Sequence, residues 1–174
     1  LASRIPSAVV NQAAGGNRVL QDGLGPNVLA RLDRDLLATS GVSQAIVFEG
    51  VNDIGTAAPA AADAVAAQLI DAYDQILVRA HAQEIRVYGA TITPFGGNTG
   101  YDTPEREAAR QRVNAWIREP GHFDAVLDFD RVARDPAAPA RLLPAYDVGD
   151  HLHLNPAGYR ALGSSVPRQL FDGS

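Results

Sequence analysis

The chain has 174 residues, of which 46% are hydrophobic and 20% charged, proportions that suit one globular domain with its own core. Its formal net charge of −5 is spread along the sequence without a basic patch, which argues against nucleic-acid binding. No apolar run approaches the roughly 20 residues of a membrane-spanning helix, and zero Cys excludes disulfides, thiolate metal sites and a Cys nucleophile.

The N-terminal part of the chain alternates short apolar runs with loops. Residues 1–5 are typical of the end of a helix that Pro6 closes, and residues 8–11 form an apolar run of strand type. A glycine-rich loop follows at residues 14–17. Because the chain opens on Leu1 and contains no Met, we expect it to be a processed or trimmed product.

Beyond this loop, strand-like and helix-like patterns alternate to the end of the chain. The apolar run at residues 45–48 is continuous, which is typical of a strand buried on both faces. Further strands are expected at residues 85–90 and 125–128, and helices at residues 28–36, 65–80, 103–117 and 155–166. This alternation predicts one α/β domain over residues 1–174, with a mainly parallel sheet covered on both faces.

The last of these helices carries clear start and stop signals. Asn155 is a good N-cap, and Pro156 stands where a first helical residue tolerates proline. The helix should bury Tyr159, Leu162 and Val166 and should kink or end at Pro167. The loop before it is therefore expected to be held against a rigid element.

Polar and glycine-rich segments follow three of the expected strands. They are residues 15–17, residues 50–53 and, after a long Pro-rich connection from Asp135 to Pro144, residues 150–153. Each alone also fits a turn or a helix cap. Because ligands bind beyond the carboxyl ends of parallel strands, their common position indicates one functional site.

Within residues 150–153, Asp150 and His153 suit acid–base chemistry. An aspartate can orient an imidazole, which then acts as general base for a hydroxyl nucleophile. A metal hydrolase is a second possibility, since His151 and His153 with Asp147 and Asp150 offer zinc ligands.

These motifs resemble those of a known enzyme family. Gly50-Val51-Asn52-Asp53 resembles the G-x-N-D block of the SGNH hydrolases, also called GDSL esterases and lipases, and residues 150–153 resemble their D-x-x-H block. Residues 11–18 resemble the block that supplies the family's oxyanion glycine, which falls at Gly16. The resemblance implies a three-layer αβα sandwich with a flavodoxin-like sheet, and ester hydrolysis by a serine without a cofactor.

The resemblance also implies roles for individual residues. His153 would be the general base and Asp150 would orient it. The backbone N–H of Gly16 and the side-chain amide of Asn52 would donate to the oxyanion, with support from Asp53 and Asn17. His151 is left as a neighbour without an assigned role.

The sequence departs from the family at the nucleophile. The family's serine lies in a G-D-S block after the first strand, and no such block contains Ser3, Ser7, Ser40, Ser43, Ser164 or Ser165. We therefore expect the first strand, the serine and most of a helix to lie in an N-terminal segment outside this chain. On this interpretation the chain alone is inactive, and the protein is secreted or extracytoplasmic.

The substrate is expected to be a small ester, either of a short acyl chain or of an acetylated carbohydrate. The loop from Pro94 to Asp102 would wall the pocket, with Phe95 and Tyr101 offering apolar or stacking surface. The alternative from a different functional class is a non-catalytic binding module on a degenerate hydrolase fold.

Overall fold

The computed structural model describes residue 5 and residues 7–172. Apart from Ile5, the expected helix end at residues 1–5 and its closing Pro6 lie outside this set. The helices are α1 (Val28–Leu32), α2 (Val51–Thr56), α3 (Ala62–His81), α4 (Pro104–Arg118), α5 (Phe129–Ala133) and α6 (Pro156–Ser165). The strands are β1 (Gln44–Val47), β2 (Arg86–Ala90), β3 (Ala125–Leu127), β4 (Arg134–Asp135) and β5 (Ala138–Leu142).

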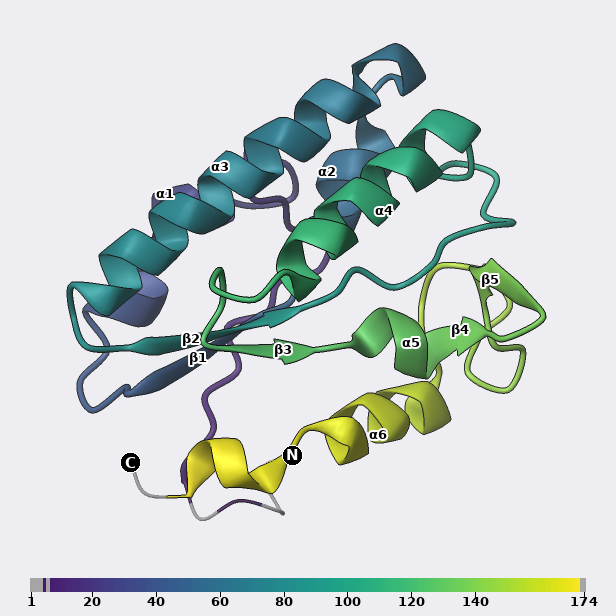
Figure 1. The fold of residues 1–174 in the computed structure, drawn as a ribbon. Coiled ribbons are helices and arrows are strands. Elements are labelled where there is room, and N and C mark those ends of the chain that lie inside the picture. The colour runs from purple at the N-terminus through teal and green to yellow at the C-terminus, as the bar shows by residue number, and fades with distance from the viewer. Residues whose placement is uncertain (1–4, 6, 173–174) are drawn as a thin grey trace.

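A parallel sheet in the order β1-β2-β3 forms the middle layer, with Ala45 opposite Val87 and Gly89 opposite Val126. Helices α1, α3 and α4 cover one face, and α6 covers the other (Figure 1). The predicted α/β sandwich with a parallel sheet is therefore confirmed. Among the described residues, no helix is long and apolar enough to cross a membrane.

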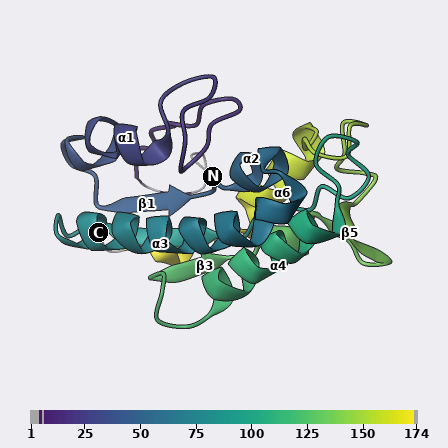
Figure 2. The same ribbon diagram turned by 90° about the horizontal axis from the view of Figure 1, so that it is seen from above.

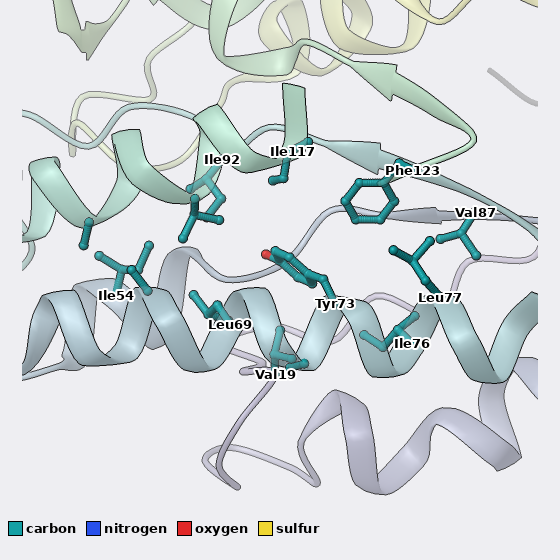
Figure 3. Close-up of a cluster of buried hydrophobic side chains, with 14 of the residues drawn as sticks. Val19, Ile54, Leu69, Tyr73, Ile76, Leu77, Val87, Ile92, Ile117 and Phe123 are labelled. Atoms are coloured by element: carbon teal, nitrogen blue, oxygen red, sulfur yellow. The ribbon is translucent and has the colours of Figure 1, made fainter. Parts of the chain in front are cut away.

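Side-chain alternation along β2 divides the core between the two faces. Val87 packs with Tyr73 and Ile76 of α3 in the cluster above the sheet (Figure 3). Tyr88 and Ala90 point the other way, into the cluster between the sheet and α6, to which α5 also contributes. This period of two is what a strand imposes on its side chains, and here both faces of β2 are buried.

Local capping signals fix where the long helices begin. Thr103 Oγ1 accepts the backbone N–H of Arg106 at the start of α4. Asn155 Oδ1 accepts the N–H groups of Ala157 and Gly158 at the start of α6, as its sequence signal predicts. The last helix ends at Ser165, before Pro167, but Tyr159 is 56% exposed, so the expectation that it is buried was wrong.

Two strand predictions on the β1 side of the sheet were also wrong. Residues 8–11 form no strand, and Val9 and Val10 are exposed. β1 is not buried on both faces, because Ile46 and the following Phe48 are 36% and 38% exposed. In the described residues β1 is an edge strand that pairs only with β2, so Ile46 and Phe48 lack the cover that a further strand would provide.

The Pro-rich connection also holds more structure than its sequence indicates. α5 precedes it, and the connection itself contains most of an antiparallel hairpin of β4 and β5. Gly96 donates its N–H to the carbonyl of Ala140 at 2.7 Å, which ties this hairpin to the loop after β2. The hairpin therefore supports the loops that gather at the carboxyl ends of the strands.

Candidate active site

Asp150 and His153 are in direct contact. Oδ2 of Asp150 lies 2.6 Å from Nδ1 of His153, while Oδ1 accepts the backbone N–H groups of His153 and Leu152 at 2.8 and 2.9 Å. These hydrogen bonds, led by those from His153, lower the pKa of the Asp150 carboxyl to about 2. The carboxylate is therefore ionised at neutral pH and can only accept, so Nδ1 of His153 donates the hydrogen of this bond.

The outer nitrogen of this imidazole is open. Nε2 of His153 has no hydrogen-bond partner among the described residues, and the side chain is 65% exposed. The supporting loop is held by Asn155, whose Nδ2 donates to the carbonyls of Ala145 and Asp147 at 2.9 and 3.2 Å. The ring is thus fixed on one side and free to accept a proton on the other.

A second aspartate–histidine pair is interleaved with the first in residues 147–153, here called the dyad loop. Nδ1 of His151 lies 2.7 Å from Oδ2 of Asp147, and Oδ1 of Asp147 accepts the N–H of Gly149 at 2.7 Å. Each histidine therefore has its own aspartate, and the described residues contain no group of three His, Cys, Asp or Glu side chains that could hold a metal. The sequence predicts Asp147 and His151 only as possible zinc ligands, whereas the structure pairs them with each other.

Asn52 and Asp53 are placed by the turn into α2. Gly50 has φ +106°, and a Cβ there would lie 2.7 Å from the Tyr73 hydroxyl, so the turn requires glycine. Asp53 is buried and accepts the backbone N–H groups of Val19 and Leu20 at 2.9 and 3.0 Å. Burial raises the pKa of its carboxyl, while these N–H donors act in the opposite direction. The contacts of Asp53 therefore anchor the loop that follows Asn17.

Asn17 and Gly16 form the turn on the other side of this anchor. Asn17 is buried; its Nδ2 donates to the carbonyl of Pro26 at 2.8 Å, and its Oδ1 accepts from Arg31 Nη2 at 2.7 Å. Asn52 Nδ2 donates to the Asn17 carbonyl at 2.8 Å. An amide nitrogen carries two hydrogens, so this bond leaves one donor of Asn52 unused.

Gly16 stands at the exposed corner of this turn. Its φ is +68°, a conformation that favours glycine, and a Cβ would lie 2.7 Å from Leu24 Cδ1. Its backbone N–H makes no hydrogen bond within the described part of the chain. Within the described residues, Gly16 and Asn52 therefore each keep one donor without a partner, and the Asn52 amide contacts the Asn17 carbonyl next to Gly16 in sequence. Figure 2 shows the N-terminal loop and α2 as neighbours beyond the end of β1.

Arg31 and Glu49 also belong to this cluster, although no motif in the sequence marks either residue. Arg31 donates from Nη1 to the Gln12 carbonyl at 2.7 Å and to Asp35 Oδ2 at 2.8 Å, and its Nη2 lies 3.8 Å from Glu49 Oε1. Burial raises the pKa of the Glu49 carboxyl to about 7, with Arg31 acting in the opposite direction. The contacts of Arg31 with Gln12 and Glu49 join segments that are distant in the sequence, so no local pattern reveals them.

The loop between β2 and α4 joins the two clusters. The Tyr101 hydroxyl donates to Asn52 Oδ1 at 2.9 Å, and Asn98 Nδ2 donates to the Asp150 carbonyl at 2.8 Å. Phe95 is fully buried and packs against Tyr101, so the expectation that its ring faces a pocket was wrong. The reason is that the loop turns its aromatic residues toward α2 and α4.

Comparisons with known proteins bear on this arrangement. The family model of the GDSL-like lipase/acylhydrolase family matches residues 1–161. Among curated proteins, no sequence match was found. A GDSL-like lipase from Bacteroides thetaiotaomicron VPI-5482 has a similar structure, with a TM-score of 0.63 and 16% identity over 83% of this chain and 68% of that one.

Two further solved structures share the fold. A protein ascribed to the G-D-S-L lipolytic family of Desulfitobacterium hafniense DCB-2 gives a TM-score of 0.58 at 20% identity, over 79% of this chain and 70% of that one. A catalytic mutant of an acetylxylan esterase from Geobacillus stearothermophilus gives 0.55 at 18% identity, over 79% and 63%. These likenesses show the fold, and the family model covers most of the sequence. The chain belongs to the GDSL-like lipase/acylhydrolase family.

Proposed function

We propose that the protein hydrolyses carboxylic esters with His153 as general base. The observation that carries the proposal is the His153 imidazole, held at Nδ1 by an ionised Asp150 and open at Nε2. In this arrangement Nε2 takes the proton of an attacking hydroxyl, and Asp150 stabilises the imidazolium that forms.

The proposed oxyanion donors are the Gly16 N–H and the second amide hydrogen of Asn52. Neither hydrogen has a partner among the described residues, and the first amide hydrogen of Asn52 is already bound to the Asn17 carbonyl. Such donors act where negative charge develops in the transition state, and losing one typically lowers kcat by about 10² to 10³. Asp53 and Asn17 hold the two donors through the loop contacts described above.

The proposed nucleophile is a serine on a segment outside these 174 residues. Among the described serines, Ser7, Ser40, Ser43, Ser164 and Ser165, none hydrogen-bonds to His153, while Ser3 and Ser174 lie outside the described residues. The outer edge of β1 supports this proposal, because it pairs with no described strand and is flanked by exposed apolar side chains. A parallel strand on that edge would end beside Gly50, next to Asn52.

The proposed substrates are esters of short acyl groups, with acetylated carbohydrate as the first class to test. The acetylxylan esterase among the similar structures supports this choice, at 18% identity. Secretion of the protein stays a prediction.

The test is hydrolysis by the full-length protein of p-nitrophenyl esters of increasing acyl length and of acetylated xylan. We expect turnover of the acetyl esters, with kcat at least 10³-fold lower in His153→Gln. His81→Gln is the matched control, because His81 also pairs with an aspartate, Asp124, at 2.9 Å and lies apart from the site. Absence of turnover on every ester would contradict the proposal and favour a binding module.

A further inference from the structure

Loop 97–102, between β2 and α4, contacts both halves of the candidate site. At one end Asn98 Nδ2 donates to the carbonyl of Asp150 in the dyad loop. At the other end the Tyr101 hydroxyl donates to Oδ1 of Asn52 at the start of α2. The general base and the side-chain oxyanion donor are therefore joined through one short loop.

This loop is braced by its own hydrogen bonds. Asn98 Oδ1 accepts the N–H groups of Gly100 and Tyr101, both at 3.0 Å, and its carbonyl accepts the N–H of Asp102 at 2.8 Å. The Asp102 carboxylate in turn accepts the N–H of Gly97 at 2.7 Å. A loop closed in this way moves as a unit, so its two outer contacts are mechanically coupled.

The Asn17 carbonyl and the Tyr101 hydroxyl together hold the side-chain amide of Asn52 in one orientation. The Asn17 carbonyl can only accept, so the Asn52 atom beside it is the nitrogen, and the Tyr101 hydroxyl donates to the oxygen. Burial raises the pKa of the Tyr101 hydroxyl, which keeps this donor protonated. The ring packs directly on Gly55, where no Cβ would fit, and this contact fixes its place.

The Asn98 end of loop 97–102 packs against the dyad loop. Beside Asn98, Gly97 has φ +98°, and a Cβ there would lie 3.2 Å from the ring of His151. The hydrogen bond from Asn98 Nδ2 to the Asp150 carbonyl, at 2.8 Å, joins the same two loops. The dyad loop therefore rests against loop 97–102 through both a packing contact and a hydrogen bond.

The geometry points to loop 97–102 as a spacer that sets the separation between the His153–Asp150 pair and the Asn52 amide, with Asn98 and Tyr101 as positioning residues. This inference rests on the proposed function, in which both groups act on the same ester. Reacting groups that are misplaced by about 1 Å can lose about 10²-fold in rate, so a spacer of this kind controls kcat without touching substrate.

The test compares Tyr101→Phe, Asn98→Asp and the double variant in the full-length protein. Tyr101→Phe keeps the ring on Gly55, and Asn98→Asp keeps the oxygen that accepts within the loop, so each removes one outer contact. We expect kcat on p-nitrophenyl acetate, taken on the pH plateau, to fall about 10-fold in each, with KM changed less than about twofold. Because either break releases the spacer, the double variant should fall little further.

Tyr88→Phe is the matched control, since its hydroxyl donates to the Leu170 carbonyl at 2.8 Å on the face of the sheet that α6 covers. It should leave kcat unchanged. The spacer inference is refuted if Tyr101→Phe and Asn98→Asp both keep kcat within about twofold of wild type. It is also refuted if the two losses in kcat multiply to about 100-fold in the double variant.

If the wild-type protein hydrolyses no ester, the proposed function is refuted but the spacer inference is not. Amide hydrogen exchange then tests whether loop 97–102 holds the dyad loop in place. Tyr101→Phe should speed exchange in residues 147–153, which it does not touch, and Asn98→Asp should do the same. Tyr88→Phe should leave that exchange unchanged. Unaltered exchange of residues 147–153 in both loop variants would overturn the spacer.

Discussion

The partly buried carboxyl of Glu49 makes the stability of the fold depend on pH. Burial raises its pKa, Arg31 offsets part of that rise and Asp53 adds to it, and together these effects take the pKa from 4.5 to about 7. In the unfolded chain the group loses its proton at about 4.5, whereas in the native state it keeps the proton up to about 7. Between about pH 4.5 and pH 7 the native state therefore binds more protons than the unfolded chain, so the free energy of unfolding falls as the pH rises through this range.

The size of this fall follows from the shift. At about 1.4 kcal/mol per pKa unit, a rise from 4.5 to about 7 corresponds to about 3 kcal/mol, of which roughly 2.5 kcal/mol lies between pH 5 and pH 8. The side chain of the Glu49→Gln variant cannot ionise, so the variant lacks this pH-dependent contribution to the free energy of unfolding. Relative to wild type, we expect the variant to gain about 2.5 kcal/mol in free energy of unfolding between pH 5 and pH 8.

The assay is urea unfolding at both pH values, followed by the fluorescence of Trp116, the only tryptophan. Comparing each variant with wild type at the same pH cancels the titration of all other groups. Glu84→Gln, the same substitution at an exposed glutamate, reports the effect of losing a charge as such. If Glu49→Gln and wild type change in parallel between the two pH values, the assignment of a partly buried, protonated Glu49 is refuted.

Two further stability predictions concern buried polar anchors. Asp53→Ala leaves the buried N–H groups of residues 19–20 without an acceptor and should cost about 3–5 kcal/mol in urea unfolding, and a loss below about 1 kcal/mol would contradict the anchor. Arg110→Met removes a fully buried partner 2.7 Å from the buried Asp130. Because Arg118 still pairs with Asp130, we expect the free energy of unfolding to fall by about 3 kcal/mol, the lower end of the range for a broken buried ion pair. An unchanged free energy of unfolding would refute this prediction.

The parts of the fold that the sequence predicts correctly are mostly those set by local signals. The stripe of Leu69, Tyr73, Ile76 and Ala80 specifies the buried face of α3, and the side-chain caps mark where α4 and α6 begin. These signals act within a few residues, so they can be read without knowledge of the tertiary structure. The contact of Asp150 with His153 belongs to the same class, because its residues lie three apart on one turn.

Contacts between distant segments could not be predicted in this way. Whether residues 8–11 become a strand depends on a neighbour that no local pattern reveals, and Ile46 is exposed because β1 pairs only with β2 in the described residues. The bond of Tyr101 to Asn52 joins residues 49 apart in the sequence, and that of Asn98 to Asp150 joins residues 52 apart. The sequence therefore indicated the chemical groups of the site but not the loop that connects them.

The serine mechanism is tested most directly by labelling the full-length protein with a fluorophosphonate and locating the label by peptide mass spectrometry. We expect a single labelled serine outside the 174 residues, on the segment proposed to pair with β1, and loss of labelling in His153→Gln. A label on any serine within these residues, or ester turnover without labelling, would contradict the mechanism.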